Sequence, residues 1–144
     1  MINKKILLLF FSIIFSQPLL ASSHYPIIEL DPKRIEAGKV LYQDNCASCH
    51  GAKLEGAKNW QTEKDPDGQN LAPPLNGTGH TWHHSDALLF NIIKYGIGKF
   101  VKDYKGKMVG VGDNLTNDEI DDILVYIKSY WKKDVFDYQI KLKN

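Results

Sequence analysis

The pentapeptide Cys46-Ala47-Ser48-Cys49-His50 decides how this 144-residue sequence is interpreted. It has the pattern C-x-x-C-H, which is the attachment signature of c-type haem. Each thiol can add to one vinyl group of a haem, and the histidine that follows can then ligate the iron. Both cysteines of the sequence lie here, so none remains for a structural disulfide. The pattern predicts one covalent haem c, held by Cys46 and Cys49, with His50 as an axial iron ligand.

The cysteine pair has three other interpretations besides haem attachment. Such a pair is a thioredoxin-like redox motif in a βαβ context, half of a zinc site where a second ligand pair is present, or a chance occurrence. The histidine that follows directly and an export signal upstream favour haem over all three.

The first 23 residues have the layout of a secretory signal. Lys4 and Lys5 precede an apolar run over residues 6–15, and small residues follow. This order is typical of a signal that is removed, with cleavage after Ala21 or after Ser23. The run is shorter than the roughly 20 residues of an ordinary membrane-spanning helix. Retention as an uncleaved anchor is the alternative.

Removal of residues 1–23 would leave residues 24–144 as one domain, which agrees with the length. This domain carries 16 basic and 17 acidic residues, and such a balance gives no support to nucleic-acid binding. No second long apolar stretch follows the signal. We therefore expect an exported, soluble periplasmic protein without stable membrane insertion.

The first two of three predicted helices flank the region of the pentapeptide. Asp31 as N-cap and a proline at the first helical position predict a helix over residues 32–45. Ser85 as N-cap and Gly96 as a C-terminal stop predict a second helix that runs to Tyr95. The face of the first helix that we expect to be buried consists of Ile35, Gly38, Leu41 and Tyr42.

The last predicted helix has the clearest sequence pattern. Thr116 and Glu119 form a capping box, and acidic residues fill the first turns, where the helix dipole favours them. We expect this helix to end between Trp131 and Lys133. Its apolar stripe consists of Ile120, Ile123, Leu124, Ile127 and Trp131.

The absence of convincing strand alternation predicts an all-α fold. Three main helices and their loops would wrap around the haem. Residues 51–81 show little periodicity and contain Pro73-Pro74, which excludes a helix there. A loop of this length is unusual in a compact domain, so we expect it to pack on the porphyrin.

Met108 is the predicted second axial ligand. Apart from Met1, which would leave with the signal, it is the only methionine, and it lies in a glycine-rich stretch, residues 105–112. A thioether ligand raises the haem potential, whereas filling core gaps is the usual role of methionine. The alternatives are His80, His83 and His84, as haem ligands, as an accessory metal site, or as surface residues.

Further haem contacts are predicted around these ligands. A ligating imidazole usually donates its second N–H to a carbonyl or carboxylate, for which Pro73 and Pro74 are candidates. Trp60, Trp82 and Tyr104 would either donate to the haem propionates or pack as apolar surface. Among these residues, Pro74 and Trp82 are the preferred cofactor contacts.

Taken together, these residues resemble the monohaem cytochrome c family with His/Met ligation, from about Ile35 to Trp131. The haem motif, the segment Pro73-Pro74-Leu75 and Met108 ahead of the last helix carry the resemblance. It implies the cytochrome c fold and an electron-carrying role. Val109 occupies a position where family members often have proline.

Three functions are compatible with these features. The first is a non-enzymatic electron carrier, since the sequence has no nucleophile elbow, phosphate loop or evident carboxylate pair. The second is a haem subunit or haem enzyme of a small-molecule oxidoreductase, for example of sulfur compounds, with a labile sixth ligand. The third is a metal-handling protein that uses the three histidines. For the carrier, an acidic redox partner would meet a basic rim of Lys94, Lys99, Lys102, Lys105 and Lys107.

Overall fold

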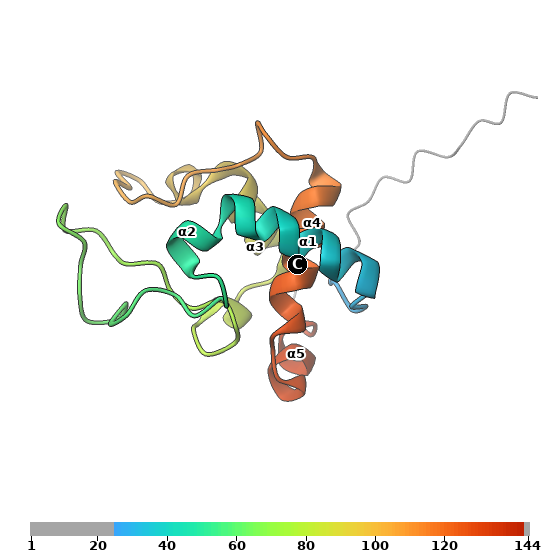
Figure 1. Cartoon of the computed structure of the whole chain (residues 1–144). Coiled ribbons are helices and arrows are strands. Elements are labelled where there is room, and N and C mark those ends of the chain that lie inside the picture. The colour runs from blue at the N-terminus through green and yellow to red at the C-terminus, as the bar shows by residue number, and fades with distance from the viewer. Residues whose placement is uncertain (1–24, 143–144) are drawn as a thin grey trace, which may run out of the picture.

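The computed structural model describes residues 25–142, and its regular structure is helical (Figure 1). The predicted signal over residues 1–23 lies outside the described residues. Within the described range, no helix is long and apolar enough to cross a bilayer. The α-helices are α1 (Pro32–Asn45), α2 (Ala47–His50), α3 (Asp86–Tyr95), α4 (Asn117–Ser129) and α5 (Lys133–Gln139), with 3-10 helices at Thr81–His83 and Ile97–Lys99.

The caps of the three main helices are those expected from the sequence. The Asp31 carboxylate accepts hydrogen bonds from the N–H groups of Lys33 and Arg34 at 2.7 and 3.1 Å, and α1 then runs to Asn45. Ser85 caps α3 in the same way, through the N–H of Leu88. The capping box of α4 is complete in both directions. Local hydrogen bonding therefore sets where these helices begin.

The core forms where α1 crosses α4. Gly38 allows the close approach, because a Cβ at this position would lie 1.9 Å from the carbonyl oxygen of Asp122. One turn later, the buried Tyr42 ring packs against Tyr126 at a centroid distance of 5.3 Å. The predicted stripe of α4 is buried as a whole, including Trp131 just beyond the helix.

The C-terminal region differs from the sequence prediction. α4 ends at Ser129, before the expected range of residues 131–133, and the additional helix α5 follows. α5 has no apolar stripe that periodicity would reveal. Its position is set by Gln139, which is buried and donates from Nε2 to the carbonyl oxygen of His84 at 3.1 Å and to Asp86 Oδ1 at 2.8 Å.

A buried ion pair joins α3 to α4. Lys128 Nζ lies 2.8 Å from Asp86 Oδ2, and both side chains are fully buried. The backbone of Ile27 completes the cluster, since its N–H donates to Asp86 at 2.6 Å and its carbonyl accepts from Lys128 at 2.8 Å. Burial lowers the pKa of Lys128, and the adjacent Asp86 carboxylate opposes this shift. The segment that precedes α1 is thereby attached to the core.

Candidate haem site

The attachment motif begins at the end of α1. The N–H of Cys46 donates to the carbonyl of Tyr42 at 2.8 Å, and the one-turn helix α2 then carries Cys49 and His50. Both thiols are free, Cys46 being half-buried and Cys49 exposed. Burial, with a smaller contribution from the neighbouring Cys49, raises the pKa of the Cys46 thiol to about 11. This thiol is therefore un-ionised at neutral pH in the haem-free chain.

The imidazole of His50 is oriented by the opposite loop. Its Nδ1 lies 2.9 Å from the carbonyl oxygen of Pro73. Because a carbonyl can only accept, Nδ1 carries the hydrogen and Nε2 keeps its lone pair. Burial also lowers the pKa of His50, which favours the neutral ring. A neutral imidazole with a free Nε2 is the form that ligates iron.

The loop that carries Pro73 is itself held in place from several directions. The N–H of Leu75 donates to the carbonyl of the buried Leu54 at 2.9 Å. The indole N–H of Trp131 donates to the carbonyl of Leu75 at 2.8 Å. Gly56 lies so close that a Cβ there would be 2.4 Å from the nitrogen of Pro74. The position of the His50 acceptor is therefore fixed by the core as well as by the loop.

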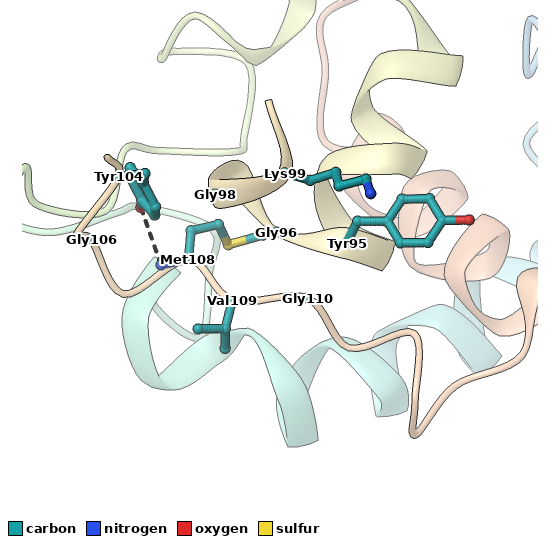
Figure 2. A pocket seen from close by; sticks show the side chains of 9 residues that line it. All are labelled: Tyr95, Gly96, Gly98, Lys99, Tyr104, Gly106, Met108, Val109 and Gly110. Carbon is teal, nitrogen blue, oxygen red and sulfur yellow. Dashed lines mark hydrogen bonds between the residues drawn. The ribbon is translucent and has the colours of Figure 1, made fainter. Parts of the chain in front are cut away.

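Met108 lies in the loop between α3 and α4, and its backbone is bonded on both sides (Figure 2). Its N–H donates to the hydroxyl oxygen of Tyr104 at 3.2 Å, and its carbonyl accepts from the N–H of Ile97 at 3.2 Å. A little further on, the N–H of Val111 donates to the carbonyl of Ile93 at 3.0 Å. These bonds attach the methionine loop, residues 104–112, to the C-terminal end of α3.

The half-buried Met108 side chain lines an open pocket of about 250 Å³. Much of the lining is glycine, as Figure 2 shows, and Gly96 has φ +77°. A Cβ at Gly96 would lie 2.7 Å from the nitrogen of Gly110. The missing side chains let the loop approach the end of α3 closely. The lining residues are Tyr95, Gly96, Gly98, Lys99, Tyr104, Gly106, Met108, Val109 and Gly110.

The donor groups present fit a covalently attached haem. Cys46 and the adjoining helix α2 bring together two free thiols and one correctly oriented imidazole, and the methionine loop supplies a thioether. When bound, the haem supplies an iron centre that gains and loses one electron. Cys46 and Cys49 would attach the haem, and His50 would ligate its iron. The axial role of Met108 stays a prediction.

The remaining predicted haem contacts have other partners in the structure. The indole N–H of Trp82 donates to the carbonyl of Gly79 at 3.0 Å, so it holds the histidine-side loop, and its donation to a propionate stays a prediction. Tyr104 accepts from Met108 and keeps its own O–H proton free for donation. Trp60 stacks on His80 at a centroid distance of 5.8 Å.

The three neighbouring histidines are engaged mainly with aromatic rings. His83 packs against Trp82 at 3.7 Å between centroids, and His84 lies edge-on to His80 at 5.6 Å. Burial, together with charge repulsion from the other two histidines, lowers the pKa of His84. Within residues 25–142, no three His, Cys, Asp or Glu side chains are placed to hold a metal ion. The separate metal site therefore gains no support.

Sequence reasoning missed one ionic contact beside the site. Lys107 Nζ lies 2.8 Å from Asp65 Oδ2, and the pair joins the loop after α2 to the methionine loop. The sequence does predict the turn at Pro66-Asp67-Gly68. It contains no signal that links this turn to residue 107, because the contact depends on how two irregular loops fold.

The fold and the attachment motif define a small helical haem-binding domain of the electron-transfer type. The family model described as cytochrome c matches residues 35–131, and the chain belongs to this family. Membership implies haem-based electron transfer by a covalently bound haem c.

Individual relatives are longer proteins. The chain is 31% identical over 93 residues to the cbb3-type cytochrome c oxidase subunit FixP of Azorhizobium caulinodans, which covers 64% of this chain and 28% of the relative. It is 32% identical over 108 residues to a nitrite reductase of Stutzerimonas stutzeri, and the match covers 69% of this chain and 16% of the relative. FixP of Bradyrhizobium diazoefficiens is 28% identical over 109 residues, and the match covers 71% of this chain and 33% of the relative. The chain thus spans a third or less of these relatives.

Proposed function

We propose that this chain is a soluble periplasmic electron carrier with one haem c, bonded to Cys46 and Cys49. Residues 1–23 act as the export signal, and residues 24–144 form the functional domain. His50 and Met108 are the axial ligands. The observation that carries the proposal is the His50–Pro73 hydrogen bond, which prepares the imidazole beside two free thiols.

Each part of the site has a task in electron transfer. The thioether links keep the haem from leaving, and the Pro73 carbonyl keeps the His50 ring from rotating. A methionine on the other face stabilises the reduced iron and raises the potential. Because both ligands stay bound in both oxidation states, the surrounding structure rearranges little when the electron moves.

The surface of the methionine loop suits a redox partner with acidic residues. Of the five lysines in the predicted rim, Lys107 pairs with Asp65, and Lys94 donates to Asn117 at 2.7 Å. The other three, Lys99, Lys102 and Lys105, are exposed. They flank exposed apolar residues, which are Phe100, Val101 and Val109. An apolar centre with a charged rim is typical of transient interfaces. Electron-transfer rates with an acidic partner should therefore fall steeply as the salt concentration rises. Rates that do not change with salt would exclude electrostatic steering by this rim.

The second candidate is a haem subunit or haem enzyme of a larger oxidoreductase. The observation that favours it is the set of relatives, an oxidase subunit and a nitrite reductase, whose own chains extend far beyond the matched region. In that case the sixth iron position would be labile, and exogenous ligands would bind rapidly. The same haem domain would then pass electrons to a catalytic partner.

The test is to produce the full chain in a bacterial host that has the haem-attachment machinery. We expect the mass of one haem above that of the polypeptide and a colour that survives denaturation. The ferric protein should show the weak long-wavelength charge-transfer band of an iron–thioether bond. Met108→Leu should abolish that band and lower the midpoint potential, because the thioether favours reduced iron.

The matched controls are His80→Gln, His83→Gln and His84→Gln, since these three histidines are the rival ligands. Each should leave both the band and the potential unchanged. If one of these histidine variants altered them and Met108→Leu did not, the haem would have two histidine ligands. A wild-type protein without the band that binds cyanide or CO rapidly would support the second candidate instead. A colourless product at the bare polypeptide mass would refute both.

A further inference from the structure

The two loops beside α2 are joined by the ion pair between Lys107 and Asp65. Figure 1 shows both loops extending on the same side of the helical core, with α2 between them in this view. Lys107 Nζ lies 2.8 Å from Asp65 Oδ2 and 3.5 Å from Asp67 Oδ2. Lys107 directly precedes Met108, and Asp65 belongs to the loop that also supplies Pro73. The pair therefore connects the segment that carries Met108 to the loop that supplies the hydrogen-bond acceptor of His50.

The acidic partner is held in position before it meets the lysine. Asp65 Oδ1 accepts from the N–H groups of Asp67 at 3.0 Å and Gln69 at 2.8 Å. The backbone N–H of Asp65 in turn donates to the carbonyl of Gln69 at 2.9 Å. The Asp65 side chain is only 11% exposed. Its second oxygen, Oδ2, is thereby directed at Lys107, so little side-chain entropy is lost when the pair forms.

The basic partner is fixed by its neighbours in the methionine loop. The carbonyl of Lys107 accepts from the N–H of Val109 at 2.9 Å, and the next residue is bonded to Tyr104 and Ile97. The backbone at residue 107 therefore cannot move far without moving Met108. A movement of Lys107 therefore also moves the backbone of Met108, which carries the thioether side chain.

We propose that the Asp65–Lys107 pair is a clasp that holds the methionine loop closed over the haem and so keeps Met108 on the iron. The inference rests on the proposed function, since it requires Met108 to be the ligand. Both residues are positioning residues. For an external ligand to replace Met108, the methionine loop must move outward, and this movement separates Lys107 from Asp65. Loss of the clasp should therefore increase the fraction of open molecules.

The test measures the rate of cyanide binding to the ferric holoprotein at low salt. Lys107→Gln and Asp65→Asn should each accelerate binding about two- to fivefold, the range expected for an exposed ion pair. The asparagine keeps an oxygen that can accept the two backbone N–H bonds, so only the charge is lost. The double variant should be no faster than either single variant. High salt should accelerate the wild type and leave the double variant unchanged.

Two further variants separate the clasp from general loop effects. Lys107→Arg keeps the cation and should retain the wild-type rate. Lys105→Gln removes an exposed lysine from the same loop and should leave the rate of cyanide binding unchanged, since no redox partner takes part in this measurement. Thermal unfolding of each variant checks that it is folded.

Equal rates in Lys107→Gln and Lys105→Gln, or additive effects in the double variant, would overturn the clasp while leaving the haem ligation intact. An unaltered charge-transfer band in Met108→Leu would instead remove the proposed ligand, and the clasp with it.

Discussion

At the scale of residues, the position of the methionine loop depends on Gly96. Gly96 combines a left-handed backbone, φ +77°, with close contacts to the methionine loop. A Cβ at this position would lie 3.0 Å from the carbonyl oxygen of Met108 and 2.7 Å from the nitrogen of Gly110. Any side chain there must push the loop away from α3 or distort the turn.

Gly96→Ala should therefore destabilise the protein by about 1–3 kcal/mol, from backbone strain and the lost approach. It should also speed cyanide binding to the ferric protein. Gly98→Ala is the matched control, because a Cβ there would meet only the Tyr104 ring, at 3.7 Å. Its stability should change by no more than about 0.5 kcal/mol. Equal losses in the two variants, measured by denaturant unfolding, would contradict this account of Gly96.

At the scale of elements, the buried Asp86–Lys128 pair holds α3, α4, α5 and the segment before α1 together. Asp86 accepts from Ile27, Lys128 and Gln139, and Lys128 also donates to the carbonyl oxygen of Ile27. Burying two charges is costly, and the hydrogen bonds around them offset that cost. The pair therefore fixes how the elements are arranged, while the apolar contacts of α1 and α4 supply most of the driving force.

Lys128→Met should cost about 3–5 kcal/mol, because it leaves the Asp86 carboxylate buried without its cation. Its aliphatic side chain roughly preserves the packing against Phe136, over which Lys128 Nζ lies at 5.0 Å. Lys132→Met, at an exposed position beyond the same helix, should change stability by no more than about 0.5 kcal/mol. Unfolding in guanidinium chloride measures both. Loss of less than 1 kcal/mol in Lys128→Met would show that the pair is not needed for stability.

At the scale of the whole molecule, a helical core supports two long loops, which we expect to pack on the haem. Most core residues come from α1, α3 and α4, and Ile27, Leu54 and Trp131 are the buried contributions from outside these helices. The other loop has exposed apolar side chains, Phe100, Val101 and Val109. The stability of the loops should therefore depend on the cofactor more than that of the core does.

In a haem-free variant with Cys46→Ala and Cys49→Ala, we expect amide hydrogen exchange to distinguish the two parts. Residues 57–72 and 98–110 should exchange much faster than in the holoprotein, since they lose the surface on which they pack. The amides of α1 and α4 should stay protected under the same conditions. Equal deprotection of loops and helices would mean that the haem is needed for the core itself.

Local sequence patterns predicted much of this structure. Asp31, Ser85 and Thr116 marked the starts of the three main helices correctly, because an N-cap acts through hydrogen bonds to residues only two or three positions away. The haem attachment motif could be recognised in the sequence for the same reason, since the residues that bind the haem are adjacent. The family resemblance depends largely on this motif. The all-α fold class is confirmed by both the structure and the family match.

Only the tertiary structure decided the contacts between distant segments. The Asp86–Lys128–Gln139 cluster, which positions helix α5, and the Asp65–Lys107 pair each join residues far apart in the sequence, where no periodicity or spacing applies. Such contacts exist because burial and loop packing bring particular side chains together, and a buried charge must then find a partner. The sequence by itself thus determined the three main helices and the attachment chemistry, while three-dimensional packing determined helix α5 and how the loops are held around the core.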